Sequence, residues 1–194
     1  MLSNKFFNQD ALCVARKLLG KVIRAKYKDI WLSAMITATE AYYIHDKASH
    51  SSLGYTEKRK ALFMPPGTIY MYYARGGDSL NVSVKGQGNA VLIKSALPYI
   101  DQNTPQNMLE VMQKLNPLKN SNLPRPPPKL CSGQTLLCNS LNLKVKEWDQ
   151  KQFDPNQLYF EDVSYKPTKI IQTTRLGIPK GRDEDLLYRF ILVS

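Results

Sequence analysis

One glutamate is followed closely by aromatic residues that could hold a planar ligand. Glu40 comes after an apolar, β-favouring run, Tyr42 and Tyr43 follow it, and His50 lies in the polar segment beyond. A carboxylate at the end of a strand is held by a rigid element, and aromatic side chains beside it offer flat faces for stacking. The pattern predicts that Glu40 performs chemistry on a planar group such as a nucleobase.

A hairpin and a loop are expected to position these residues. Residues 21–26 and 31–39 are β-favouring runs joined by a short polar link, which predicts a hairpin whose second strand ends at Glu40. Residues 43–60 are polar and contain a glycine, so we expect a loop there. The glutamate would then lie where a rigid strand meets a functional loop.

Further elements are expected to complete a mixed domain. The candidate strands are residues 69–74, 80–84, 90–95, 169–174 and 189–193, and the candidate helices are residues 11–20, 104–114 and 132–141. Gly76 and Gly77 lie between the first two of these strands and permit a tight hairpin tip. Residues 115–129 are rich in proline and cannot form a regular helix or a central strand, so we expect a loop. Because strands and helices do not alternate regularly, the chain is predicted to be a single α+β domain spanning residues 1–194.

The chain carries a large excess of positive charge. Of its 194 residues, 27 are Lys or Arg and 16 are Asp or Glu, which gives a formal net charge of +11. Such an excess favours a polyanionic partner, with a basic protein that has no nucleic-acid role as the alternative. The three cysteines lack a C-x-x-C pair, which argues against a disulfide framework and a cysteine zinc site. No run resembles a signal peptide or a membrane span, so we expect a cytoplasmic or nucleoid protein, or a nuclear one in a eukaryote.

Several motifs occur in an order that resembles a known family. They are residues 12–20, 38–42, 48–50, 64–72, 80–83, 90–94, 129–133 and 175–178. This ordered set resembles the 3-methyladenine DNA glycosylases of the alkyladenine type, most clearly over residues 6–98. The resemblance implies an α+β fold with a curved antiparallel sheet flanked by helices. It also implies a monofunctional enzyme that removes damaged purines from duplex DNA without a metal or cofactor, and we expect a monomer that does not contact membranes.

The resemblance assigns the catalytic step to Glu40. Breaking an N-glycosidic bond builds positive charge on the sugar, and a carboxylate near C1′ can stabilise that charge and take a proton from an attacking water. Glu40 matches the general base of the family. The alternative is a strand-end acid that simply pairs with a lysine, which is the commoner role of an acid in a basic protein.

The resemblance also implies a slot for an extruded base. Tyr42 matches the residue that stacks on one face of the base, and His50 and Tyr72 match residues on the other face. Stacking returns about 1–3 kcal/mol per base, which can offset the few kcal/mol that flipping costs. Asn81 matches a residue at the pocket floor that crowds the 2-amino group of undamaged guanine. The alternative roles are strand packing for both tyrosines, a solvated loop position for His50 and a turn position for Asn81.

Three positions depart from the family pattern. Many members carry an apolar wedge at the hairpin tip, where this chain has Arg75; the planar guanidinium can stack between bases, or Tyr73 can act as the wedge instead. Lys94 replaces the arginine of vertebrate-type relatives and is expected to contact the target phosphate and help hold the water. Leu176 aligns with a residue whose backbone carbonyl contacts that water. The third departure is Gln134, which stands where relatives usually have proline.

Two other functions are compatible with these residues. A non-catalytic binder of damaged or bent DNA would share the basic surface and the aromatic slot. An RNA-binding domain would prefer single strands. Neither explains an acid among the stacking residues of a nucleic-acid site, because a carboxylate repels phosphate. The leading prediction is therefore an enzyme that hydrolyses the N-glycosidic bond of alkylated or deaminated purines.

Overall fold

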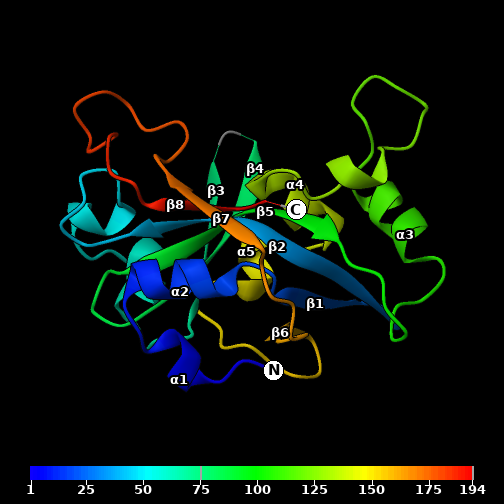
Figure 1. The fold of residues 1–194 in the computed structure, drawn as a ribbon, viewed down its shortest axis with the longest axis horizontal. Helices are drawn as coiled ribbons and strands as arrows, with labels where there is room; N and C mark the ends of the chain where they lie inside the picture. The colour runs from blue at the N-terminus through cyan, green and yellow to red at the C-terminus, as the bar shows by residue number, and fades with distance from the viewer. Residues whose placement is uncertain (75, 194) are drawn as a thin grey trace.

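The computed structural model describes residues 1–74 and 76–193 (Figure 1). The helices are α1 (Asn4–Phe7), α2 (Ala11–Leu18), α3 (Met108–Leu115), α4 (Gln134–Ser140) and α5 (Val145–Trp148), with 3₁₀-helices η1 (His50–Leu53), η2 (Glu57–Phe63) and η3 (Pro127–Lys129). The strands are β1 (Val22–Tyr27), β2 (Ile30–Tyr42), β3 (Ile69–Ala74), β4 (Gly77–Ser83), β5 (Ala90–Pro98), β6 (Leu158–Glu161), β7 (Lys169–Thr173) and β8 (Arg189–Val193). Within these described residues, no helix combines the length and the apolar character that crossing a membrane requires.

The strands named above form one sheet in which every pairing is antiparallel. The order β3-β4-β5-β2-β1-β6 runs across it, and the hairpin of β7 and β8 joins through β8 to β2. Because β1 and β8 pair with successive parts of β2, the sheet divides along this strand and curls, with helices against it (Figure 1). The predicted α+β class with a curved antiparallel sheet is confirmed.

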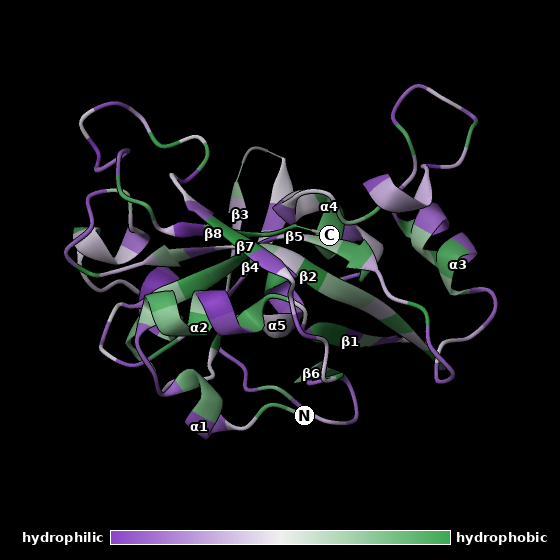
Figure 2. Cartoon of the chain, in the orientation of Figure 1, coloured by the Kyte–Doolittle hydropathy of each residue, from purple (hydrophilic) through white to green (hydrophobic). Residues whose placement is uncertain are grey.

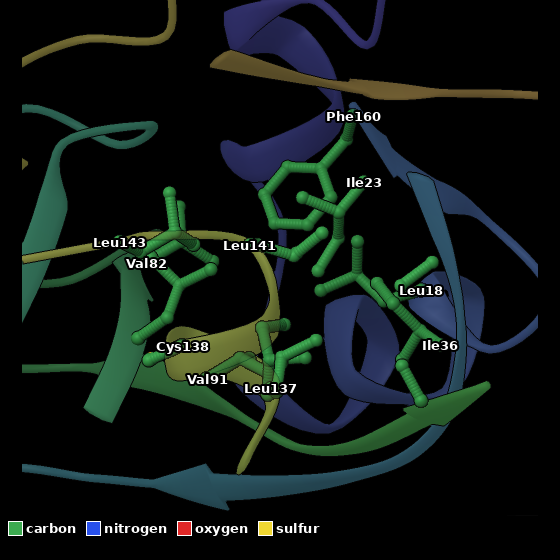
Figure 3. Packing of buried hydrophobic residues seen from close by; sticks show 14 of the residues in the cluster. Leu18, Ile23, Ile36, Val82, Val91, Leu137, Cys138, Leu141, Leu143 and Phe160 are labelled. Atoms are coloured by element: carbon green, nitrogen blue, oxygen red, sulfur yellow. The ribbon is translucent and has the colours of Figure 1, made fainter. Parts of the chain in front are cut away.

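The core lies between the curled sheet and its helices, chiefly α2 and α4. Asp10 caps α2 by accepting hydrogen bonds from the N–H groups of Leu12 and Cys13 at 3.0 and 3.4 Å, which satisfies donors that a helix start leaves free. Leu137 of α4 packs with Val91 of β5 in the same cluster (Figure 3). Hydrophobic residues accordingly concentrate on the strands, and hydrophilic ones on the projecting loops (Figure 2).

Strand β2 carries the residue that was expected to do the chemistry. Its 13 residues pair with β1, β5 and β8. The register with β5 shifts on both sides of Ala38, an irregularity of the kind that re-aims side chains next to functional sites. Glu40 lies two residues further along and pairs with Leu92 on β5 and with Arg189 on β8. The backbone of Glu40 is therefore held by a strand on each side.

Two strand boundaries differ from those expected. β2 continues past Glu40 because β5 pairs with it as far as Tyr42, so the expected strand end at Glu40 is wrong. β4 begins at Gly77 rather than at residue 80, because Gly77 already pairs with Ala74. The five-residue link predicted between these strands is therefore also wrong, because residues 77–79 belong to β4. The short elements α1, α5 and β6 were not predicted, since each spans four residues and has too few positions to show a period.

Two predicted loops have internal order of their own. The polar segment 43–60 contains η1 and the start of η2. Beyond α3, the proline-rich segment contains neither an α-helix nor a strand up to Lys129, as predicted. Arg125 closes this segment by donating to the carbonyl oxygens of Asn116 and Pro117 at 2.9 and 2.8 Å. The Asn116 side chain donates in turn to Ser140 Oγ at 3.0 Å, which anchors the loop on α4.

Candidate active site

Strand register places the predicted residues on one face of the sheet. Glu40 pairs with Leu92, Leu92 with Asn81, and Asn81 with Tyr70, across β2, β5, β4 and β3. Directly paired residues point to the same side of a sheet, and so do residues two positions apart on one strand. This face therefore also carries the neighbours two positions along, which are Tyr42, Tyr72, Ser79 and Lys94.

The same face forms the wall of a cavity of about 590 Å³. The predicted residues that line it are Tyr42, His50, Tyr72, Asn81, Lys94 and Leu176. Residues 176–179 and the first residues of α4 also line it, so loops and a helix end complete the enclosure. Sites for small ligands are commonly about 300–1,000 Å³ in volume, so this cavity is large enough for a purine.

Glu40 lies directly behind this wall with no exposed surface. Its Oε2 accepts a hydrogen bond from the Tyr42 hydroxyl at 2.8 Å, and its Oε1 accepts one from the backbone N–H of Leu176 at 3.2 Å. Lys94 Nζ lies 3.4 Å from the same Oε1. A buried carboxylate needs such donors, because an unpaired buried charge is costly. All three of these partners line the cavity, so the carboxylate adjoins the cavity through them.

The alternative role of Glu40, an acid paired with a lysine, is met only in part. The pair exists, but the Lys94 side chain keeps 18% of its surface exposed and opens onto the cavity. For Leu176, the observed contact with the carboxylate uses the backbone N–H. The role expected for its carbonyl oxygen stays a prediction.

Behind Tyr42 lies a buried arginine that was not predicted from the sequence. The Arg175 guanidinium carbon is 4.6 Å from the centroid of the Tyr42 ring. Arg175 forms an ion pair with Asp46, with 3.0 Å between Nη2 and Oδ1, and neither side chain is exposed. It also donates to the carbonyl oxygen of Ala41 at 3.2 Å. The only sequence signal was its place at the start of the family-like block 175–178.

Burial keeps the Tyr42 hydroxyl in its protonated form. Burial itself raises the pKa of Tyr42, and the nearby Glu40 carboxylate raises it further by charge and by accepting the hydrogen bond. The hydroxyl is therefore a fixed donor to Glu40 at any physiological pH. The arrangement holds the ring of Tyr42 at the cavity wall.

His50 begins η1 and contacts two tyrosines that also line the cavity. Its Nδ1 lies 2.8 Å from the Tyr70 hydroxyl, and its ring centroid lies 4.5 Å from that of Tyr72 in an edge-on arrangement. Partial burial lowers the pKa of His50, and the positive charges of Arg59 and Arg182 lower it further. The imidazole is therefore neutral at neutral pH, and the contacts with the tyrosines fix its orientation.

The pocket floor and the hairpin tip complete the predicted set. Asn81 is buried, and its Nδ2 donates to the carbonyl oxygen of Tyr70 at 3.2 Å, which fixes the amide beside the cavity. Tyr73 is 68% exposed near the end of β3, and the next residue, Ala74, lines the cavity. The other wedge candidate, Arg75, lies outside the described residues. An exposed aromatic side chain thus stands next to the cavity at the tip of the hairpin.

Lys94 has a second partner that was not predicted. Its Nζ donates to Gln134 Oε1 at 3.1 Å, and Gln134 Nε2 donates to Ser79 Oγ at 2.8 Å. Gln134 is the first residue of α4 and lines the cavity. The sequence showed only that this position departs from the family pattern.

Known proteins match almost the whole chain. The family model described as "Methylpurine-DNA glycosylase (MPG)" matches residues 5–194. Proteins from Pseudomonas syringae pv. tomato and Pseudomonas aeruginosa are 62% and 59% identical over 190 residues, covering 98% of this chain and 85% and 79% of their own lengths. A protein from Clostridium botulinum is 32% identical over 199 residues, covering 98% of this chain and 95% of its own length. All three are named "Putative 3-methyladenine DNA glycosylase".

Proposed function

The chain belongs to the methylpurine-DNA glycosylase family, and we propose that it is a monofunctional DNA glycosylase that removes damaged purines, 3-methyladenine among them, from duplex DNA. The reaction is hydrolysis of the N-glycosidic bond, which starts base excision repair. The observation that carries the proposal is the buried Glu40 carboxylate directly behind a cavity lined by aromatic residues.

Glu40 acts as the general base in this proposal. A water on the cavity side gives a proton to Glu40 as it attacks C1′, and the carboxylate stabilises the positive charge that develops on the sugar. A carboxylate has about four lone-pair sites, and Tyr42, Leu176 and Lys94 approach three of them. One site therefore remains for the water. In this proposal Lys94, which lies beside the carboxylate, also contacts the target phosphate and helps to hold the water.

The aromatic residues hold the flipped base. Tyr42 stacks on one face, and His50 with Tyr72 forms the other, since all three line the same cavity. Stacking of about 1–3 kcal/mol per base offsets the few kcal/mol that extrusion costs. Asn81 lies at the floor, where its fixed amide would crowd the 2-amino group of a normal guanine.

The leaving base sets how much acid assistance the site must supply. A cationic alkylated purine leaves readily, because departure neutralises its charge. A neutral lesion such as hypoxanthine requires a proton donor near N7. Uncharged His50 suits a cationic base, because a charged imidazole beside it would repel the substrate.

The DNA partner is supported by the charge of the whole chain. A net charge of +11 favours association with the phosphate backbone. Tyr73 or Arg75 at the hairpin tip fills the gap left by the extruded base, and the exposed side chain of Tyr73 is suited to that role. We propose a monomer that acts on DNA in the cytoplasm or nucleoid.

Glu40→Gln tests this function directly. The amide keeps the size of the side chain but cannot take a proton, so base release is expected to fall by about 10²–10⁴-fold, the usual contribution of general base catalysis. Duplexes that each carry one lesion are incubated with excess enzyme, and abasic sites are scored after strand cleavage by heat and alkali. Glu110→Gln, at an exposed position of α3, is the matched control and is expected to retain full activity.

The rival function, a non-catalytic binder of damaged or bent DNA, predicts a different result. It requires that the unaltered protein bind lesion duplexes and produce no abasic sites. If Glu40→Gln released bases as fast as the unaltered protein, the assignment of Glu40 would be rejected. Retained binding of the lesion duplex by Glu40→Gln, with release lost, is the outcome expected here.

A further inference from the structure

Lys94 stands at the centre of a chain of polar contacts that links two walls of the cavity. On one side its ammonium lies 3.4 Å from Glu40 Oε1. On the other it donates to Gln134, which donates to Ser79. Ser79 pairs directly with Tyr72 across the β3–β4 hairpin. The catalytic carboxylate and the stacking hairpin are thus joined through one lysine and one glutamine.

We propose that Gln134 is a positioning residue that holds the Lys94 ammonium against Glu40 and ties this pair to the β3–β4 hairpin. The inference rests on the proposed catalytic role of Glu40. It adds a residue from α4, an element that carries none of the residues assigned to the base or the water.

The chemistry of lysine explains why such a residue is needed. An ammonium is a compact point charge on a flexible four-carbon stem, and it cannot grip a carboxylate with two parallel bonds as arginine does. Lys94 is also partly exposed to the cavity, so its stem has freedom to lose. A second acceptor on the far side of the ammonium restricts that freedom and keeps the charge beside Glu40.

The chemistry of glutamine suits both of its contacts. Its carbonyl oxygen accepts from Lys94 while its amide nitrogen donates to Ser79, so the amide orientation is fixed by two different partners. A glutamate could not donate to Ser79 as an acceptor-only carboxylate, and it would add a second negative charge that competes for the ammonium. A leucine could make neither bond.

The helix that carries Gln134 is itself fitted closely to the hairpin. A Cβ atom added at Gly77 would lie 2.1 Å from Cγ2 of Thr135, the residue after Gln134. Only a glycine at the start of β4 allows the first turn of α4 to approach so closely. This close approach holds Gln134 beside the hairpin that also carries Tyr72.

A double-mutant cycle between positions 94 and 134 tests the proposal. Gln134→Leu is expected to lower the single-turnover rate of base release about tenfold, the effect of one hydrogen bond to a charged group. Affinity for an undamaged duplex should not change, because the phosphate that Lys94 is proposed to contact is that of the extruded nucleotide, and an undamaged duplex keeps its bases stacked. In a Lys94→Arg background the same change is expected to cost less than about twofold, since the guanidinium fork can hold the carboxylate without help.

A matched control separates positioning from folding. Gln113→Leu, on α3, also removes a partly buried glutamine, whose amide donates to the carbonyl oxygen of Arg125 at 2.9 Å away from the cavity. It is expected to leave the release rate unchanged, and all variants are compared by thermal unfolding. Ser79→Ala removes the hydroxyl that accepts the hydrogen bond from Gln134, and it should also lower the rate of base release.

The outcomes separate this inference from the proposed function. An unaltered release rate in Gln134→Leu, or an equal loss with and without the Lys94→Arg change, would overturn the positioning role while Glu40→Gln still abolished release. If the unaltered protein released no base, or Glu40→Gln released it normally, the proposed function itself would fail. A loss confined to the lysine background, with unchanged duplex affinity, supports the inference.

Discussion

Two ion pairs contact Tyr42, one at its ring and one at its hydroxyl, and they are built differently. Behind the ring, Arg175 and Asp46 are fully enclosed and share two contacts through the guanidinium fork. On the cavity side, Lys94 meets Glu40 through one contact of 3.4 Å and keeps 18% of its side-chain surface exposed. The first pair is closed to solvent, and the second opens to it.

The difference suits the two pairs to different roles, support of the site for Arg175 with Asp46 and the proposed reaction for Lys94 with Glu40. Breaking a buried ion pair leaves an uncompensated charge, so an enclosed pair holds its geometry tightly. Arg175 uses that geometry to support Tyr42 and to place the next residue, Leu176, whose N–H reaches Glu40. The proposed general base, Glu40, must exchange partners with water, and its single contact with Lys94 beside the cavity allows that exchange.

Removing the charge of Asp46 should have the largest effect on stability. Asp46→Asn leaves the Arg175 guanidinium buried without its counter-ion, and arginine cannot shed its proton. We expect a loss of about 3–5 kcal/mol in the free energy of unfolding, measured by urea titration. Base release should fall as well, because the support behind Tyr42 is disturbed.

Asp29→Asn is the matched control for this change. It makes the same substitution at an exposed position in the turn between β1 and β2, where a charge contributes little. If the two variants had the same free energy of unfolding, the ion pair of Arg175 and Asp46 would not support the site. The contrast between the two ion pairs would then be lost.

Removing the charge of Lys94 should affect the rate more than the stability. In Lys94→Met the carboxylate keeps its bonds from Tyr42 and Leu176, so the unfolding free energy should change less than in Asp46→Asn. The single-turnover rate should fall about 10- to 100-fold, as expected for one charge-assisted contact. Lys85→Met, at an exposed loop position, controls for the loss of one positive charge. A large loss of stability with a normal rate would reverse the roles assigned to the two pairs.

The residues at the cavity could be proposed from the sequence, and the ion pair of Arg175 and Asp46 could not. Glu40, Tyr42 and His50 fall within 11 consecutive positions, and their types suggest chemistry without any knowledge of tertiary structure. Arg175 and Asp46 are 129 residues apart, and a charged residue in a polar segment is normally solvated. They pair only in the folded chain. When β8 pairs with β2, the segment that precedes β8 and contains Arg175 lies against the loop that follows β2 and contains Asp46.

Strand ends and the contacts of Gln134 also depend on tertiary pairing, which the sequence does not display. Long strands with many β-favouring residues, such as β2 and β5, were predicted, although their ends were misplaced because pairing partners decide where a strand stops. Gln134 shows the limit for the site. Its departure from the family pattern was visible, but its partner Ser79 lies 55 positions away, on β4. Only the packing of α4 against β4 brings the two residues together.

The smallest expected effect concerns His50, which lines the same cavity as Tyr42. Its pKa in the folded protein is lowered, mainly by burial, from an ordinary value of about 6.5. Below that pH the unfolded chain binds a proton that the folded protein resists, so the contribution of His50 to stability is complete above about pH 6.5 and declines as the pH falls towards the lower folded value. The melting temperature should therefore drop between about pH 7.5 and 5.5, and less so in His50→Gln.

His45→Gln is the control for this last prediction, because the chain has two histidines and His45 lies outside the cavity lining. The quantity to compare is the pH slope of the melting temperature, since the loss of the Tyr70 contact alone would lower stability equally at every pH. An equal change of slope in both variants would contradict a specific role of His50. A flatter slope in His50→Gln alone would sharpen the contrast between the charged Arg175 behind Tyr42 and the uncharged His50. The proposed binding of cationic purines would require that contrast, because Arg175 is neutralised by Asp46 and His50 carries no charge to repel the base.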